Sequence, residues 1–357
     1  MHRYPISLAL RGSFKLWAHT MNGHTLQHLS ARYGDALDSA LAARLAGDGD
    51  PVFFGMMQYQ FGYVDEFLRP AATATGKRFR PMLCLFAAES VGGRWEDALT
   101  AAAAIELLHN FSLIHDDIED RDPSRRHRPT VWKLWGEPQA INVGDAVYAE
   151  ATRAVLSSHP DAAVCLEIAR GFGDCVLRLT EGQYMDMSFE TRSDVLPSEY
   201  VRMIELKTAH LIAFSLTAGG LIGGAALAQR QALQDFGFEL GKAFQIRDDI
   251  LGIWAPREET GKEVAMDLQN RKKTLPVLLA AARAGDAGRR LLQAFLRREC
   301  DDVSAILDVL ESTGARRQAE EEVSQHMRAA EGALAQAHLP PALALSFRAL
   351  AAQLTGQ

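Results

Sequence analysis

Segment 209–228 (AHLIAFSLTAGGLIGGAALA) carries hardly a charged side chain. A run that is apolar on every side predicts a helix buried in the centre of a bundle, because a surface helix keeps one polar face. Its paired glycines, Gly219-Gly220 and Gly223-Gly224, predict close helix packing or a kink. We therefore expect a helical protein with a large central core.

The same kind of periodicity runs along most of the chain, with apolar residues at spacings of three and four. It covers segments 26–45, 97–118, 141–157, 162–187, 198–222 and 230–254. Runs of alternating β-branched and polar residues are almost absent, so we predict an all-α fold with little or no sheet. Because no Pro-, Ser- or Gly-rich linker interrupts residues 24–357, we expect them to form one helical domain.

The composition excludes some classes of function. Of 357 residues, 48% are apolar and 23% charged, which is typical of a folded chain with a large core. A net charge of −7 argues against nucleic-acid binding, which needs a basic surface. No apolar run reaches the length of about 20 residues that spans a bilayer. The scattered cysteines indicate reduced thiols in a cytoplasmic protein: Cys84, Cys165, Cys175 and Cys300.

Residues 1–23 are expected to be an N-terminal extension. Arg11 and Lys15 interrupt its weakly apolar stretch and no small-residue cleavage site follows, so we expect no signal peptide. A mobile extension and an amphipathic segment that touches a membrane are both consistent with this composition.

Two aspartates end a strongly apolar segment at 107–130 (LLHNFSLIHDDIEDRDPSRRHRPT). Asp116 and Asp120 are four residues apart, so on a helix their carboxylates leave one face about 6 Å apart. Such close carboxylates repel unless a cation lies between them, and hard oxygen ligands suit Mg²⁺. A solvated acidic helix end is the simpler interpretation. The arginines that follow, Arg125 and Arg126, favour a diphosphate bound through metal.

A second acidic pair, Asp248 and Asp249, lies inside the apolar segment 244–254 (FQIRDDILGIW). Charged groups within such a helix are costly unless they coordinate something. A charge near a helix end is the simpler interpretation here too. Two inward-facing pairs would allow several Mg²⁺ ions to hold one diphosphate.

Short basic elements complete the pattern. Lys77 and Arg80 lie three residues apart in GKRFRP, and Lys207-Thr208 interrupts an apolar stretch. A Gly-Lys pair with a downstream lysine follows near the end of the pattern. Each element alone is consistent with solvated charge or with a lysine whose stem is buried and whose amine reaches water. Their joint order along the chain is the specific signal.

That order is a basic motif, DDxxD with trailing arginines, Lys-Thr, FQxxDD, and Gly-Lys with a downstream lysine. It resembles the trans-isoprenyl diphosphate synthases, the family of farnesyl and geranylgeranyl diphosphate synthases, over about residues 50–280. The resemblance implies the isoprenoid synthase fold, a helical bundle with a central cavity, and a homodimer. It implies an enzyme that joins isopentenyl diphosphate head to tail to an allylic diphosphate, with Mg²⁺ as cofactor and three ions in each active site.

The resemblance also assigns roles to individual residues. The metal ligands would be Asp116, Asp120 and Asp248, supported by Asp117 and Asp249. Residues that would bind the allylic diphosphate or line its cavity are Arg125, Gln183, Lys207, Thr208, Gln245, Lys262 and Lys272. Residues that would bind isopentenyl diphosphate are Lys77, Arg80, His109 and Arg126.

In the implied reaction the allylic C–O bond ionises to leave a carbocation. The double bond of isopentenyl diphosphate attacks that carbocation, and a proton is then lost to the released diphosphate. Cationic side chains, Lys207 among them, would stabilise the departing group. The protein would position two anions and exclude water, and would supply no covalent nucleophile.

Two residues depart from the family pattern. Gly252 stands where the second motif usually has its last aspartate, so we expect a metal there to rely on Asp248 and water. His127 stands where the arginine pair is usually followed by glycine, a change that could alter the loop and leaves both arginines in place.

Product length would depend on Phe111, about 7.5 Å before Asp116 along the helix axis, with the small Ser112 beside it. In relatives, one aromatic residue here without an insertion goes with a twenty-carbon product, which favours geranylgeranyl diphosphate. Core packing is the simpler role for Phe111. Farnesyl or longer-chain synthases, a class I terpene synthase and a non-catalytic partner subunit are the alternatives.

Overall fold

The computed structural model describes residues 25–71, 73, 76–255 and 265–356, so the predicted extension at 1–23 lies outside the described residues. The chain divides into two compact units. Unit 1 comprises Met1–Gly171, Ser215–Gln231 and Leu334–Gln353. Unit 2 comprises Phe172–Phe214, Ala232–Ala333 and Leu354–Gln357. The expectation of one domain over 24–357 stays a prediction.

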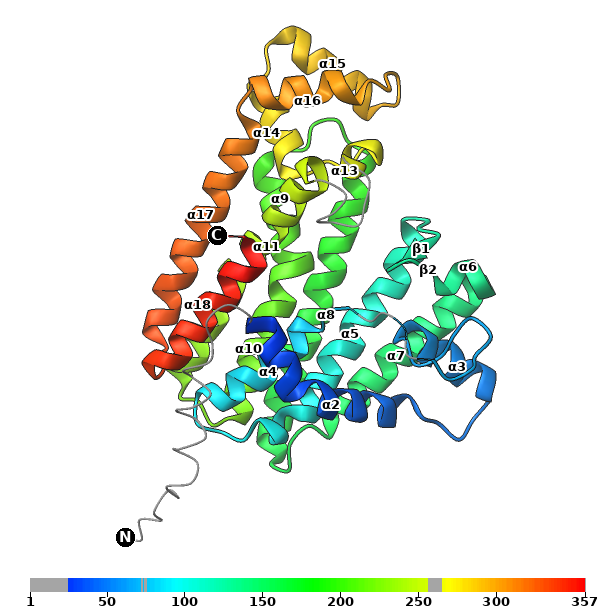
Figure 1. The fold of residues 1–357 in the computed structure, drawn as a ribbon, viewed down its shortest axis with the longest axis vertical. Coiled ribbons are helices and arrows are strands. Elements are labelled where there is room, and N and C mark those ends of the chain that lie inside the picture. Colours follow the sequence, from blue (N-terminus) through cyan, green and yellow to red (C-terminus); the bar gives the residue numbers. More distant parts are fainter. Residues whose placement is uncertain (1–24, 72, 74–75, 256–264, 357) are drawn as a thin grey trace. The chain divides into compact units, whose positions relative to one another are not determined.

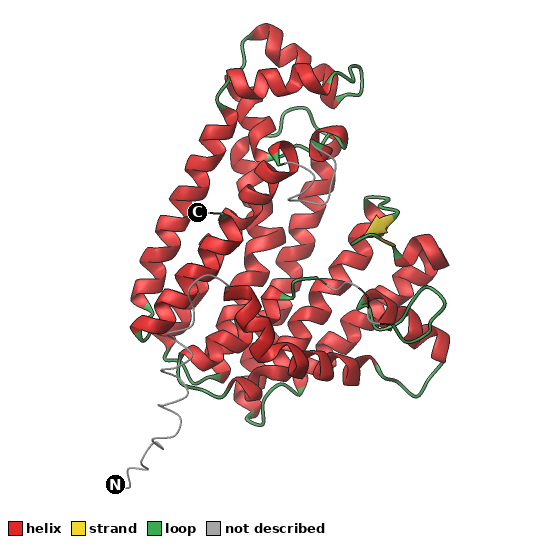
Figure 2. Ribbon diagram, in the orientation of Figure 1, coloured by secondary structure: helices red, strands yellow, loops and turns green. Residues whose placement is uncertain are grey.

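The all-α prediction is confirmed. Helices dominate both units, as the red ribbons of Figure 2 show. Within the described residues the only named strands are β1 (Ser124–Arg125) and β2 (Arg128–Pro129), which pair antiparallel in a two-residue hairpin. None of the described helices has the length and hydropathy to span a membrane.

Unit 1 is built largely from the first half of the chain. Its elements are α2 (Thr25–Leu45), α3 (Pro51–Gln60), α4 (Phe79–Ser90), η1 (Trp95–Ala98), α5 (Leu99–Glu119), β1, β2, α6 (Val131–Trp135), α7 (Glu137–Leu156), most of α10 (His210–Ile222) and most of α18 (Pro341–Thr355). Helix α5 is the central one, because it packs on α2, α4 and α7. Figure 1 shows α5 and α7 running side by side.

Small residues allow this close packing around α5. Ala101, Ala102, Ala103 and Ala104 are buried in one run, with large apolar neighbours following them along the helix. Alanine has the highest helix propensity and loses no side-chain entropy on burial, so the run both forms helix and brings neighbouring backbones close. The aspartate motif at the end of α5 is therefore carried by the most deeply packed helix of unit 1.

The apolar segment 209–228 contains the buried helix that its composition predicts, followed by a turn and the start of the next helix. Helix α10 (His210–Ile222) ends before Gly224, whose φ of +80° stops it, and α11 (Leu227–Trp254) follows. The prediction of close packing holds at Gly219, where an added Cβ would lie 2.8 Å from the Cys84 carbonyl carbon of α4. The glycines therefore bring α10 against α4 and then end the helix.

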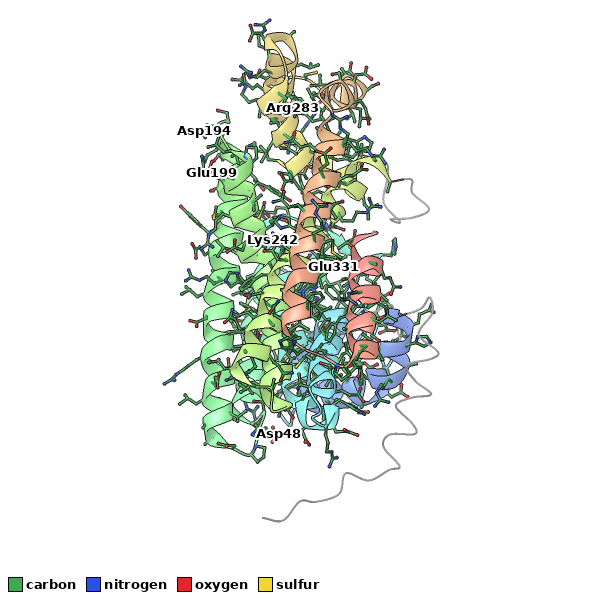
Figure 3. All side chains as sticks on the ribbon, turned by 90° about the vertical axis from the view of Figure 1, so that its left-hand side faces the viewer. Asp48, Asp194, Glu199, Lys242, Arg283 and Glu331 are labelled. Atoms are coloured by element: carbon green, nitrogen blue, oxygen red, sulfur yellow. The ribbon has the colours of Figure 1, made fainter. Side chains whose placement is uncertain are left out.

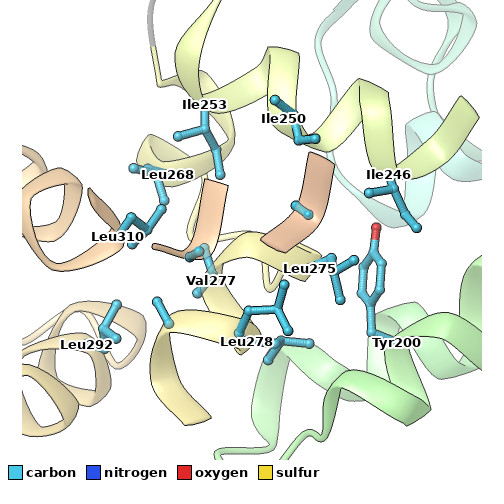
Figure 4. Close-up of a cluster of buried hydrophobic side chains, with 14 of the residues drawn as sticks. Tyr200, Ile246, Ile250, Ile253, Leu268, Leu275, Val277, Leu278, Leu292 and Leu310 are labelled. Atoms are coloured by element: carbon cyan, nitrogen blue, oxygen red, sulfur yellow. The ribbon is translucent and has the colours of Figure 1, made fainter. Parts of the chain in front are cut away.

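Unit 2 holds the second half of the chain. Its elements are most of α8 (Ala162–Thr191), α9 (Pro197–Ile204), the π-helical turn η2 (Glu205–Ala209), most of α11, α13 (Met266–Gln269), α14 (Leu275–Arg283), α15 (Asp286–Leu296), α16 (Val303–Ser312) and most of α17 (Ala315–Gln336). Figure 4 shows its core, in which Ile246, Ile250 and Ile253 of α11 lie among leucines from α13 to α16. Each such side chain stabilises the fold by about 1.5–3 kcal/mol when fully buried.

The turn between α8 and α9 is held by charged groups. Arg192 pairs with Asp194 at 3.0 Å and with Glu199 at 2.8 Å, and Figure 3 shows the two carboxylates close together. Glu199 also accepts a hydrogen bond from the Leu196 backbone N–H at 3.0 Å, which caps the start of α9. These contacts fix α9, whose Tyr200 reaches into the site described below.

Candidate active site

The predicted site residues fall into two groups, one in each unit. The unit 1 group contains the first aspartate motif, the arginine pair and the predicted isopentenyl diphosphate residues. The unit 2 group contains the second aspartate motif and the Lys-Thr pair. The structure brings the members of each group together as follows.

The last two turns of α5 carry the first motif. Asp116, Asp117 and Asp120 lie at the C-terminal end of this helix, where Asp120 is its C-cap. The side chain of Asp116 keeps 17% of its surface exposed, whereas that of Asp117 keeps 2%. The two neighbouring aspartates therefore have different environments: one is open to a ligand and the other is packed inside.

Arg125 binds the aspartates of this motif. Its guanidinium pairs with Asp117 at 2.5 Å and with Asp116 at 3.4 Å. Burial raises the pKa of Asp117 to about 6, although the charge of Arg125 acts to lower it. Burial is the larger effect because the carboxylate has lost nearly all contact with water. Arg125 therefore joins the acidic cluster as its counter-charge.

The hairpin after α5 places both arginines. Arg126 and His127 occupy its turn, and Arg128 lies over the ring of Tyr59, 3.9 Å from its centroid. Arg128 also donates to the Tyr59 backbone oxygen at 3.1 Å, and the Tyr59 hydroxyl donates to Pro129 at 2.8 Å. The hairpin is thus anchored on α3, and its arginines keep a fixed position beside the aspartates.

The predicted isopentenyl diphosphate residues form a basic group. A guanidinium nitrogen of Arg80 lies 3.3 Å from the Nε2 atom of the His109 ring. Arg126 lies against Gly76, where an added Cβ would be 2.7 Å from its guanidinium carbon. Lys77 is exposed in the loop before α4. Burial and the neighbouring arginines lower the pKa of His109 well below its usual value, so the ring is neutral.

A buried carboxyl lies behind this basic group. Glu106, one turn before Asn110 on α5, is 2% exposed and accepts a hydrogen bond from the Asn110 amide at 3.0 Å. Burial raises its pKa, while the charges of Arg78 and Arg126 act to lower it. Glu106 was not predicted from the sequence, because a single glutamate in an apolar helix gives no motif.

In unit 2 the Lys-Thr pair lies in the π-helical turn η2. The ammonium group of Lys207 pairs with Asp186 at 2.7 Å, and Thr208 donates to the Gln245 side-chain oxygen at 3.0 Å. A π-turn inserts one residue into a helix and is frequent at functional sites. Gln183, on α8, is partly buried next to Gly182, against which the Lys207 backbone packs.

The second motif divides its two aspartates in the same way as the first. Asp249 is buried and accepts hydrogen bonds from the Gln245 amide at 3.2 Å, the Leu275 backbone N–H at 3.2 Å and the Tyr200 hydroxyl. Burial raises its pKa to about 7. Asp248 is exposed, so its carboxylate is accessible. Figure 4 shows the Tyr200 hydroxyl pointing toward α11. Neither Tyr200 nor Asp186 was selected from the sequence.

Four predicted residues remain: Lys262, Lys272, Phe111 and Ser112. Lys272 is exposed in the loop between α13 and α14. Lys262 lies outside the described residues. Phe111 and Ser112, the predicted chain-length residues, lie on α5 and are partly buried. The Phe111 ring packs against Tyr148 of α7, with centroids 5.0 Å apart.

The donor groups fit a hard divalent cation bound mainly through water and phosphate. Over the described residues, no three His, Cys, Asp or Glu side chains are grouped as a complete metal site. Asp116 and Asp120 share a helix face at a spacing of four residues, and Asp248 is accessible in the other unit. Mg²⁺ typically takes one or two carboxylates and completes its shell with waters and substrate phosphates.

Comparison with known proteins identifies the class of this chain. Residues 63–313 match the family model described as polyprenyl synthetase. A (2E,6E)-farnesyl diphosphate synthase of Mycobacterium tuberculosis is 41% identical over 312 residues, 85% of each chain. A geranylgeranyl diphosphate synthase of the same organism is 37% identical over 325 residues, 87% of this chain and 93% of that protein.

Solved structures agree with this class. A polyprenyl synthetase from Streptomyces coelicolor superposes with a TM-score of 0.84 at 34% identity, covering 92% of this chain and 98% of that one. A polyprenyl synthase from Caulobacter crescentus, solved with calcium and isoprenyl diphosphate, superposes with a TM-score of 0.79 at 26% identity, covering 93% and 97%.

The fold, the motifs and these relatives define a prenyltransferase of isoprenoid biosynthesis, an enzyme of the transferase class that makes trans-prenyl diphosphates. The chain belongs to the polyprenyl synthetase family, whose members depend on a metal ion.

Proposed function

We propose that this enzyme condenses isopentenyl diphosphate with an allylic diphosphate and that its main product is geranylgeranyl diphosphate. Each aspartate pair contains one accessible carboxylate beside one buried and hydrogen-bonded carboxylate, and this observation supports the proposed reaction. Accessible carboxylates beside cationic side chains suit a diphosphate that binds together with metal.

The residues act on two diphosphates. Mg²⁺, with three ions in each active site, would be held by Asp116, Asp120 and Asp248. When bound, these ions would neutralise the charge that develops on the leaving diphosphate. The allylic diphosphate would be bound by Arg125, Gln183, Lys207, Thr208, Gln245, Lys262 and Lys272. The diphosphate of isopentenyl diphosphate would be bound by Lys77, Arg80, His109 and Arg126. Neutral His109 can donate a hydrogen bond to phosphate without adding charge.

In the reaction the C–O bond of the allylic diphosphate breaks and its electron pair leaves with the diphosphate. The double bond of isopentenyl diphosphate supplies the electrons of the new C–C bond, and a proton then leaves the neighbouring carbon for the released diphosphate. The protein holds the two substrates together and keeps water from the cation.

The aromatic contact in unit 1 supports the twenty-carbon product. Phe111 is braced by Tyr148, at 5.0 Å, and by His115, at 4.9 Å between ring centroids. A ring held by neighbouring rings is a fixed obstacle to a product chain that extends along the helix carrying Asp116, whereas an unsupported ring could rotate to another rotamer. A relative that is 41% identical is named a farnesyl diphosphate synthase, so farnesyl diphosphate is the second candidate product.

Product chromatography tests both parts of the proposal. The purified enzyme is supplied with labelled isopentenyl diphosphate, Mg²⁺ and one primer at a time: dimethylallyl, geranyl or farnesyl diphosphate. We expect label in a twenty-carbon diphosphate. A fifteen-carbon end product would establish the farnesyl alternative. No incorporation of label would exclude the condensation and favour a terpene synthase or a partner subunit.

We further propose that the enzyme is a homodimer. Within unit 2, helix α8 exposes large apolar side chains, with Leu177 at 62%, Tyr184 at 73% and Met187 at 42%. Leu177 and Tyr184 are seven residues apart and therefore share one helix face. A row of exposed apolar side chains on one long helix is typical of an interaction surface. A second copy of the chain is the occupant that we propose.

A further inference from the structure

The second aspartate motif lacks a carboxylate at the position that the first motif fills. Asp116 and Asp120 are four residues apart on α5, and the residue four after Asp248 on α11 is Gly252. Residues at this spacing project from the same helix face, with Cβ atoms about 6 Å apart. At Gly252 this face of α11 carries no side chain of its own.

The space beside Gly252 is filled by a carboxylate from another element. A Cβ added at Gly252 would lie less than 3.0 Å from the Asp267 Oδ2 atom and 2.6 Å from its Cγ atom. Asp267 belongs to α13, which follows α11 in the chain. Its carboxylate therefore occupies the volume in which a side chain at position 252 would begin.

Asp267 is held there by the packing of α13. Its neighbours Ala265 and Leu268 are 3% and 1% exposed and belong to the core of unit 2. The Lys272 backbone N–H donates to the Asp267 backbone oxygen at 2.9 Å. The guanidinium carbon of Arg271 lies 3.6 Å from the ring centroid of Phe295. A carboxylate on such an anchored turn is preorganised, which is what a metal or metal-bound water requires of its ligand.

The charge of Asp267 acts on Asp249 of the second aspartate motif. It acts to raise the pKa of Asp249, so the two carboxylates interact electrostatically. Asp249 is already engaged with Tyr200, Gln245 and Leu275. Two further carboxylates belong to this region, that of Asp248 on the same helix and that of Asp267 against Gly252.

We propose that Asp267 supplies the missing carboxylate of the second motif, as a ligand to Mg²⁺ or to a metal-bound water, and that Gly252 is the partner that makes room for it. This inference rests on the proposed function and extends it to a residue that the motif alone does not contain. Gly252 and Asp267 are then coupled, because a side chain at position 252 would displace the Asp267 carboxylate.

Binding of Mn²⁺ in the presence of inorganic diphosphate tests the pair without turnover, with free Mn²⁺ counted by electron paramagnetic resonance. We expect Asp267→Asn to weaken Mn²⁺ binding about 10-fold or more, as for other groups that orient a metal. Gly252→Ala should weaken it as well, since its Cβ displaces the carboxylate. In the Asp267→Asn background, Gly252→Ala should add little, which is the signature of coupled residues.

A control variant and a check of folding accompany the test. Asp308→Asn removes an exposed acidic group elsewhere in unit 2 and should bind Mn²⁺ like the wild type. Gly252→Ala introduces a better helix former inside α11, so a loss of affinity in that variant is not a loss of helix. Thermal unfolding without metal confirms that each variant is folded.

The outcomes separate this inference from the proposed function. Wild-type binding with unchanged affinity in Asp267→Asn would overturn the role of Asp267 and leave the proposed function standing. A loss in Asp267→Asn without a loss in Gly252→Ala would overturn the coupling to Gly252. If the wild type bound no Mn²⁺ with diphosphate while folded, both proposals would fall.

Discussion

Within each aspartate pair, the neighbours of a residue decide what its carboxylate can do. Asp117 and Asp249 are the second members of their pairs, and burial raises their pKa values to about 6 and about 7. Both are engaged by hydrogen-bond donors. Asp116 and Asp248 are the more exposed members. This difference supports the proposal that the first residue of each pair binds metal and that the second supports the local structure.

Replacing Phe111 by Ala should lengthen the product. The substitution removes a ring on the helix that carries Asp116, so a longer chain can extend past this level. Chromatography of the products from isopentenyl and farnesyl diphosphates should show a shift beyond twenty carbons. Tyr148→Ala should give a smaller shift in the same direction, because it removes the ring that braces Phe111.

Phe61→Leu is the matched control, since Phe61 is a buried aromatic residue of unit 1 outside α5. It should leave product length unchanged. If the product distribution of Phe111→Ala equalled that of the wild type, Phe111 would be a packing residue only.

At the scale of single elements, the hairpin that carries the arginines has an unfavourable turn. Arg126 and His127 form its two central residues and have φ values of +53° and +62°. Positive φ at both positions is the type I′ geometry, for which Asn and Gly are preferred. A side chain costs roughly 1–2 kcal/mol in this region. The departure from glycine at His127 therefore keeps the loop conformation and lowers its stability.

His127→Gly should stabilise the protein by about 1 kcal/mol, because glycine adopts left-handed angles without steric cost. Urea denaturation followed by circular dichroism measures the change. The control is His159→Gly, at a loop position that is not among the residues with positive φ, which should lose stability. Equal losses in the two variants would show that the turn is not strained.

Two glycines of helix α8, Gly182 and Gly173, differ in the space around them. A Cβ at Gly182 would lie 2.8 Å from the Lys207 Cα atom, whereas a Cβ at Gly173 would meet no atom within 4 Å. Gly182→Ala should push the π-turn away and lower activity and stability, by more than 1 kcal/mol for overpacking. Gly173→Ala should stabilise by about 0.5–1 kcal/mol.

Thermal unfolding and steady-state kinetics of the two variants check this expectation. Because both substitutions lie in the same helix of the same unit, helix propensity cancels in the comparison. Equal stabilities would mean that the contact between Gly182 and Lys207 relaxes without cost.

At the scale of the whole molecule, the exposed apolar face of α8 predicts that two copies of the chain assemble into a dimer. Tyr184→Glu should convert a dimer to monomers, because it places a charge in the apolar row that includes Leu177. Sedimentation velocity over a range of concentrations measures the state. Leu345→Glu, at a residue of α18 that is 58% exposed, is the matched control and should stay dimeric. A monomeric wild type at all concentrations would contradict the proposal.

The sequence by itself determined the helical class, the family and most of the motif residues. Helical periodicity is local, so the helices around 26–45, 162–187 and 230–254 follow from spacing alone. The order of the motifs was likewise readable, since it depends only on residue types along the chain. Composition also predicted the buried helix within segment 209–228, whereas the positive φ of Gly224 that follows this helix is known only from the structure.

The tertiary structure decided which side chains meet. Asp186, Tyr200 and Asp267 were not predicted from the sequence, and the packing of separate helices places them against Lys207, Asp249 and Gly252. The same packing separates two adjacent aspartates into a buried one and an accessible one, which sequence cannot distinguish. Contacts between distant residues depend on how helices pack, and periodicity carries no information about a helix's neighbours.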